Sequence, residues 1–313
     1  MRPGWGRATG RRGTHGDFYF AQGASLRMIV AALLAALACG TTPSANAGEF
    51  IAADAEMVFA VVRASNPICE PKCPEWIAAE GEIRRNTASA FKAVLKKIGK
   101  RNLPLLISSS GGDNAAAMEI GKLIRKRQMI VEVARTDYLR CRPREKGCKP
   151  ELKAGVHYGY ANTIGAFCNS ACTFVLAGGV RRLASPLSSV GIHSTVTYHE
   201  KYQSIYKHYK VKGKDGRLIR KKKVVGKKLV GFKLSSKLAK GTKEEMKRYF
   251  KAMGVKKTLV DLAFTTPHEK VYFMTMSDLR AFELATEIRE LEELVQYRVC
   301  EGSKPPEYCV ARE

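Results

Sequence analysis

Acidic residues are scarce in this chain of 313 residues: 29 Asp and Glu stand against 54 Lys and Arg, so the formal net charge is +25. Such an imbalance is unusual for a cytosolic enzyme and indicates an anionic partner, although charge alone does not identify it. The sequence has no internal repeat, and its composition, 45% hydrophobic and 27% charged, is neither fibrous nor disordered. We therefore expect a globular protein of one or two domains.

The sequence also lacks an apolar run long enough to span a membrane as a helix. The run at residues 28–39 is about a dozen residues long, follows a stretch with five arginines and one acid, and precedes Ala45-Asn46-Ala47. A basic region, a short apolar stretch and a small-residue site are the three parts of a secretory signal. We therefore expect residues 1–47 to be a cleaved signal peptide and the protein to be periplasmic or secreted.

Cysteine pairing agrees with export. Removal of Cys39 with the signal leaves eight cysteines in four close pairs. An oxidising compartment favours disulfides, and local pairing is the simplest of about 105 connectivities. A zinc site built from the pairs at 69/73 and 168/172 is the alternative, but no histidine has a matching spacing, so we expect no metal. The candidate disulfides join Cys69 to Cys73, Cys141 to Cys148, Cys168 to Cys172, and Cys300 to Cys309.

One segment, residues 201–243, holds most of the charge, with sixteen basic residues and one acid. Residues 221–232 alternate partly, which favours a hairpin, whereas a solvated, mobile loop is the alternative interpretation. An exported protein has little access to nucleic acid, so we favour an anionic membrane surface, where each nearby lysine contributes about 1 kcal/mol. The lysines that we expect to contact it are Lys221, Lys222, Lys223, Lys227 and Lys228.

Elsewhere, strand and helix patterns alternate along the chain. Residues 88–100 have one apolar helical stripe, and residues 103–107 are a short apolar run typical of a buried strand. A turn of small residues at 108–113 leads to a second helix pattern at 116–126 and a second strand at 129–134. This order predicts an α/β domain with parallel strand pairing.

Three segments carry residues suited to acyl transfer. The turn at Gly111 and Gly112 leaves backbone N–H groups unobstructed, which suits an oxyanion. Ser170 precedes an apolar helix pattern, so the helix dipole and the amide of Ala171 would stabilise negative charge there; a helix-capping serine is the alternative. His193 ends a short strand, and such a histidine taken alone is most often structural.

Together, the order and spacing of these segments resemble the Clp protease proteolytic-subunit and crotonase superfamily, above all secreted Clp-protease-like proteins of Gram-negative bacteria. Ser109-Ser110-Gly111-Gly112 holds the place of the family's Ser-Pro-Gly-Gly turn, with Ser110 where proline is expected. Asn169-Ser170-Ala171-Cys172 falls on the nucleophile turn, and Ile192-His193 follows 23 residues later, where the family has its base.

The resemblance implies a Clp/crotonase-type spiral of ββα units. Its first part would span residues 48–200 and its last part, with C-terminal helices, residues 244–313. The Lys-rich segment 201–243 takes the position of the family's handle. The resemblance also implies a homo-oligomer, although charge repulsion within the handle segment would oppose the stacking of two rings.

By resemblance, the activity is serine hydrolysis of a peptide or ester bond without a cofactor. Ser170 would attack, His193 would carry the proton, and backbone amides of the Gly111–Gly112 turn and of Ala171 would hold the oxyanion. In the family, an acid precedes a Phe-Leu-Ser-type segment, here Phe273-Met274-Thr275. Val271 stands in the place of that acid. We choose Glu269 as the acid that orients His193, with Asp261 as the alternative.

The missing acid supports a second hypothesis, a catalytically inactive envelope binding or scaffold protein that retains the fold. Cys168 or Cys172 could be a nucleophile only as a thiolate, which a disulfide between them would remove. An acyl-CoA crotonase is disfavoured because export separates the protein from that cytosolic cofactor.

Overall fold

The computed structural model describes residues 55–149, 155–289 and 294–312. The predicted signal peptide lies outside the described residues, and its cleavage stays a prediction. In the part of the chain that is described, no helix is long and apolar enough to cross a membrane.

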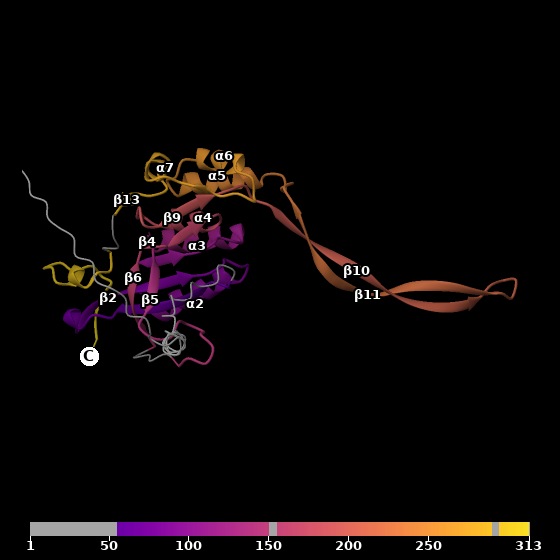
Figure 1. The fold of residues 1–313 in the computed structure, drawn as a ribbon, viewed down its shortest axis with the longest axis horizontal. Helices are drawn as coiled ribbons and strands as arrows, with labels where there is room; N and C mark the ends of the chain where they lie inside the picture. The colour runs from indigo at the N-terminus through magenta and orange to yellow at the C-terminus, as the bar shows by residue number, and fades with distance from the viewer. Residues whose placement is uncertain (1–54, 150–154, 290–293, 313) are drawn as a thin grey trace, which may run out of the picture. The chain divides into compact units, whose positions relative to one another are not determined.

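The core is a nine-stranded mixed sheet (Figure 1). Five adjacent strands, from β13 to β2, are parallel, and β1 then pairs antiparallel with β2. The two central strands are buried over nearly their whole length, as expected where both faces of a sheet are covered. In spatial order the strands are β13 (Glu287–Ile288), β8 (Arg181–Ala184), β4 (Ile130–Val133), β3 (Leu105–Ser108), β2 (Lys72–Glu80), β1 (Val58–Ala64), β6 (His157–Asn162) and β5 (Arg135–Tyr138), and β14 (Cys309–Ala311) pairs with β2.

Helices cover the sheet with the apolar stripes that the sequence predicts. Phe91, Leu95 and Ile98 are buried on one helix, and Ile120 and Ile124 on another. Two short 3-10 helices, Pro67–Cys69 and Tyr297–Cys300, each end at a disulfide-bonded cysteine. The α-helices are α2 (Thr87–Ile98), α3 (Asn114–Lys126), α4 (Cys172–Gly178), α5 (Thr242–Ala252), α6 (Thr258–Thr265) and α7 (Met276–Ala281).

A second, three-stranded sheet positions the candidate site. It consists of β7 (Phe167–Asn169), β9 (Ser189–Ile192) and β12 (Tyr272–Phe273). Strands β7 and β9 are parallel, and Asn169 lies opposite Gly191. Because parallel strands end at the same edge of a sheet, the residues that follow β7 and β9 come together.

The Lys-rich segment forms one long hairpin rather than a loop. Strand β10 (Thr197–Lys212) pairs antiparallel with β11 (Leu218–Ser235), and Figure 1 shows them as a twisted ribbon. The prediction of a hairpin within residues 221–232 is wrong, because these residues lie in a single strand, β11. The reversal occurs instead at Gly213-Lys214-Asp215-Gly216, where Gly216 has a positive φ of 78°.

The four predicted disulfides are confirmed: Cys69–Cys73, Cys141–Cys148, Cys168–Cys172 and Cys300–Cys309. The bonded sulfurs are no longer the thiolates that the alternative zinc site requires. Among the described residues, no group of three or more His, Cys, Asp or Glu could hold a metal ion.

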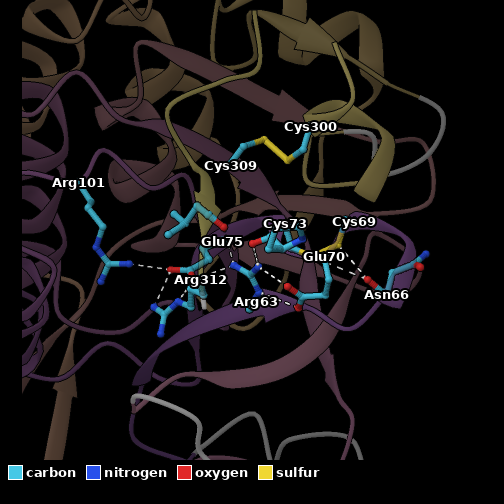
Figure 2. A network of polar contacts seen from close by, with 12 residues as sticks. Arg63, Asn66, Cys69, Glu70, Cys73, Glu75, Arg101, Cys300, Cys309 and Arg312 are labelled. Atoms are coloured by element: carbon cyan, nitrogen blue, oxygen red, sulfur yellow. Dashed lines mark hydrogen bonds and ion pairs between the residues drawn. A yellow bond between two sulfur atoms is a disulfide. The ribbon is translucent and has the colours of Figure 1, made fainter. Parts of the chain in front are cut away.

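A buried ionic cluster, which we call the Glu75 cluster, attaches the C-terminal strand to the sheet (Figure 2). The fully buried carboxylate of Glu75 accepts hydrogen bonds from Arg63, Arg101 and Arg312, at 3.3, 2.7 and 2.6 Å. Arg312 directly follows β14, which pairs with β2. Because an unpaired buried charge is costly, this compensation fixes β14 in place.

Candidate active site

Ser170 directly follows strand β7 and adopts a left-handed backbone conformation, with φ of 53°. For a residue with a side chain this conformation costs roughly 1–2 kcal/mol, so the surrounding structure must hold it. The Ser170 amide donates to Gly191 O at 2.8 Å, and its carbonyl accepts from the Thr173 hydroxyl at 2.7 Å. Among the described residues, nothing hydrogen-bonds to the Ser170 hydroxyl. A strained, well-held turn therefore presents a free hydroxyl.

The Gly111–Gly112 turn lies directly against the Ser170 turn. A Cβ atom added at Gly111 would lie 2.8 Å from Ser170 Cβ and 2.9 Å from Ala171 N, so only glycine fits there. The Gly111 amide donates to Ser109 Oγ at 3.1 Å, so it is occupied. The amides of Gly112 and Ala171 have no protein acceptor among the described residues, which leaves two N–H groups for an oxyanion.

His193 directly follows β9, and its Nδ1 atom lies 2.9 Å from the carbonyl oxygen of Ser194. A carbonyl oxygen only accepts, so Nδ1 carries a proton, and in the neutral ring Nε2 is the acceptor. This is the tautomer that a general base requires. A backbone carbonyl thus fixes the tautomer, a role that the sequence assigned to an acid.

Ser170 and His193 line the same pocket. Its polar wall includes Asn114, whose side-chain amide donates to the Thr195 hydroxyl at 3.1 Å. No hydrogen bond joins Ser170 and His193 among the described residues. The rest of the wall is mainly apolar and comes from β9, α4, α5 and α6: Phe174, Ile192, Met246, Phe250, Leu259, Val260, Ala263 and Phe264.

Neither predicted acid touches His193 in the described part of the chain. Glu269 is exposed, so its role as the orienting acid stays a prediction. The carboxylate of Asp261 lies 2.9 Å from the ammonium groups of both Lys247 and Lys243, and these hydrogen bonds lower its pKa. Asp261 is therefore engaged by lysines rather than by histidine.

The neighbour of His193 is His268, which the sequence did not single out. The centroids of the two rings are 5.3 Å apart, and the buried Nδ1 atom of His268 has no hydrogen-bond partner among the described residues. The Ser194 amide donates to Thr266 O at 2.9 Å, which holds the segment before His268 beside the end of β9. No local pattern in the sequence indicates this contact, because it depends on the pairing of β9 with β12 and because a search for an acid passes over histidine.

No family model matches this sequence, and no curated protein is similar to it. Among solved structures, the membrane-bound stomatin-specific protease 1510-N in complex with a substrate peptide is similar at 14% identity, over 68% of this chain and 73% of that chain, with a TM-score of 0.38. ClpP1 from Listeria monocytogenes is similar at 13% identity, over 70% and 93%, also with a TM-score of 0.38. These neighbours are of the predicted class, and the likeness concerns the fold alone.

Proposed function

We propose that this protein is an exported serine hydrolase of the Clp-protease type, which cleaves a peptide or ester bond. One observation carries the proposal. Ser170 and His193 line one pocket, and the glycine turn that the sequence assigned to the oxyanion lies against the Ser170 turn. The two unpartnered amides and the His193 tautomer agree with this chemistry.

In the proposed mechanism, Ser170 Oγ attacks the substrate carbonyl while Nε2 of His193 takes its proton. The amides of Gly112 and Ala171 stabilise the oxyanion, and each such donor typically lowers the barrier by about 3 kcal/mol. The imidazolium then protonates the leaving group, and a water molecule hydrolyses the acyl-enzyme with His193 again as the base. A neutral carbonyl stabilises the imidazolium less than a carboxylate, so Glu269 remains our proposed source of negative charge.

A fluorophosphonate probe on the purified protein tests this proposal. We expect labelling of Ser170 in the wild type, none in Ser170→Ala, and a rate at least 10³-fold lower in His193→Ala. The control is Ser204→Ala, which removes a serine from the hairpin and should leave labelling unchanged. A wild type that does not react would reject the hydrolase.

The second candidate function is the inactive binding or scaffold protein. It is favoured by Val271 in place of the family's acid and by the lack of a hydrogen bond between Ser170 and His193 among the described residues. Here the same pocket would hold a peptide without cleaving it. An unreactive wild type that still binds peptide, and loses binding on substitution of pocket residues such as Phe264, would support this alternative.

We also propose that the hairpin attaches the protein to anionic membranes. Residues directly opposite each other on antiparallel strands share a face, so the pairing register defines two faces of the ribbon. One face carries Lys201, Lys207, Lys221, Lys223, Lys228 and Lys233. The other carries the exposed side chains of Tyr202, Tyr206, Val224, Leu229, Phe232 and Leu234, together with Lys210, Lys212 and Arg220, so both faces are basic and both carry exposed apolar side chains. Of the five lysines that the sequence assigned to lipid, Lys222 and Lys227 lie on this second face.

Vesicle sedimentation tests the attachment. We expect binding to vesicles containing phosphatidylglycerol but not to pure phosphatidylcholine, and at least a 10-fold loss of affinity on Lys221→Gln/Lys223→Gln/Lys228→Gln. The matched control, Lys96→Gln/Lys100→Gln/Lys122→Gln, removes the same charge from the α/β body. Equal losses in the two triple variants would show that only net charge matters.

A homo-oligomer stays a prediction.

A further inference from the structure

The disulfide Cys168–Cys172 encloses the proposed nucleophile. Cys168 lies in β7, Cys172 is the first residue of α4, and only Asn169, Ser170 and Ala171 lie between them. The two Cα atoms are 5.2 Å apart, and both cysteines are fully buried. The covalent bond therefore closes across the turn that carries the Ser170 hydroxyl.

Hydrogen bonds tie the strand side of this turn to neighbouring segments, whereas at the start of α4 the Ser170 carbonyl accepts from the Thr173 amide and hydroxyl, at 3.1 and 2.7 Å, within the turn itself. The Asn169 amide donates to Ser109 O at 3.0 Å, and the Ser170 amide donates to Gly191 O at 2.8 Å. On the helix side, Ala171 is the N-cap residue of α4 and has no side chain that can accept from the first turn. Serine, threonine, aspartate or asparagine usually provides that bond. The disulfide adds to these local bonds a covalent cross-link between β7 and the start of α4, which carries the Ala171 amide.

The other three disulfides are separate from the pocket. No cysteine lines the pocket itself, but Cys168–Cys172 alone brackets Ser170 in the chain, whereas Cys69–Cys73 and Cys300–Cys309 lie by the Glu75 cluster (Figure 2). Cys69–Cys73 has the same sequence separation of 4 as Cys168–Cys172. The chain therefore contains a matched disulfide of equal loop length that does not touch the Ser170 turn.

We propose that Cys168–Cys172 positions Ser170 and Ala171 for catalysis, so that the hydrolase is competent only when this bond is formed. The inference rests on the proposed hydrolase function. In forming the bond, two thiols lose two protons and two electrons to a disulfide oxidant, which becomes a dithiol. A dithiol reductant reverses the reaction. The reduced chain keeps the fold of the α/β body, but the start of α4 moves relative to β7 and the oxyanion amide leaves its place.

A pair of double variants tests the inference. We expect Cys168→Ala/Cys172→Ala to react with the fluorophosphonate about 10²-fold more slowly than wild type, since small displacements of catalytic groups have effects of this size. On an ester substrate, kcat should fall while KM stays within twofold. Cys69→Ala/Cys73→Ala should retain labelling within twofold. Equal rates in the two variants, or a loss that appears only in KM, would overturn the inference.

A measurement on the wild-type chain covers the case in which the first variant does not fold. One tryptic peptide, residues 154–181, contains both cysteines and Ser170, so it reports the disulfide and the labelled serine together. Protein partly reduced with dithiothreitol is labelled with the probe, alkylated and digested. We expect at least tenfold higher labelling in bridged than in alkylated peptides. Equal labelling overturns the inference alone, whereas no labelling of the bridged peptide overturns the hydrolase and the inference with it.

Discussion

The Ser170 turn and the Lys-rich hairpin are built in opposite ways. Around Ser170, each group is fixed by another: a glycine that no other residue can replace, backbone hydrogen bonds, and a buried disulfide. In the hairpin, the strands mainly contact each other, and their large side chains, such as Tyr206 and Phe232, are exposed. The contacts that stabilise the fold therefore lie mainly in the α/β body, whereas the side chains of the hairpin remain accessible to a partner.

The strongest test of this comparison places the same substitution in both regions. In Gly111→Ala, the added Cβ would lie 2.6 Å from Asn169 O at a residue whose φ is 102°, so we expect at least about 2 kcal/mol of destabilisation and at least a 10²-fold loss of probe labelling. In Gly226→Ala, the nearest atom would be 3.7 Å away, and both stability and labelling should be unchanged. Urea unfolding and labelling rates check both variants. Equal tolerance at the two glycines would break the comparison.

Excision of the ribbon is the complementary test. Lys201 pairs with Gly231, so replacing residues 202–230 with Asn-Gly should close a two-residue hairpin. Because the removed side chains are largely exposed, we expect the melting temperature to change by no more than about 3 °C and labelling of Ser170 to remain, while vesicle binding is lost. Calorimetry and sedimentation measure the two effects. A cooperative loss of the body's fold would show that the hairpin supports it.

A pH-dependent effect also distinguishes the buried interior of the body from the exposed hairpin. Burial raises the pKa of Glu80 from 4.5 to about 7, although its carboxylate accepts from the Thr136 amide at 2.6 Å. The unfolded chain releases this proton at lower pH than the folded protein, so the cost to stability is absent below pH 4.5, grows up to about pH 7 and is complete above it. Glu80→Gln keeps the hydrogen-bond acceptor. Its free energy of unfolding relative to wild type should therefore rise by about 3 kcal/mol as the pH increases from 4 to 8.

Urea unfolding at several pH values measures that gain. The control is Glu307→Gln, which changes an exposed glutamate and should not give the gain in unfolding free energy expected for Glu80→Gln. A flat profile for Glu80→Gln would mean that Glu80 is ionised in the folded protein at neutral pH.

Local patterns in the sequence predicted the features that depend on near neighbours. The apolar stripe of α2, the buried run of β3 and the four short-range disulfides are of this kind. The family resemblance predicted that Ser170 and His193 lie together, and they line one pocket because each directly follows one of the two parallel strands β7 and β9; their catalytic roles stay a prediction. The burial of α2 and β3 follows from residues that lie within a few positions of one another in the chain.

Features that join distant segments could not be predicted. The contact between His193 and His268 depends on pairing of β9 with β12, and β12 contains only two residues, Tyr272 and Phe273. Likewise, partial alternation in 221–232 predicted a local hairpin, but β11 pairs with an earlier strand instead. A short or ambiguous pattern specifies a strand without specifying its partner.

The Glu75 cluster has a consequence for synthesis of the chain. Arg312 lies 237 residues after the carboxylate it neutralises, so in a growing chain that has not yet reached residue 312 the described part leaves Glu75 with only Arg63 and Arg101 as cationic partners. A prematurely terminated product would contain a sheet whose interior charge is incompletely balanced, at a penalty of several kcal/mol. We expect a product that ends before Arg312 to be cleaved by proteases faster than a chain that contains it, because β14 and the arginine that follows it are then not fixed on the sheet.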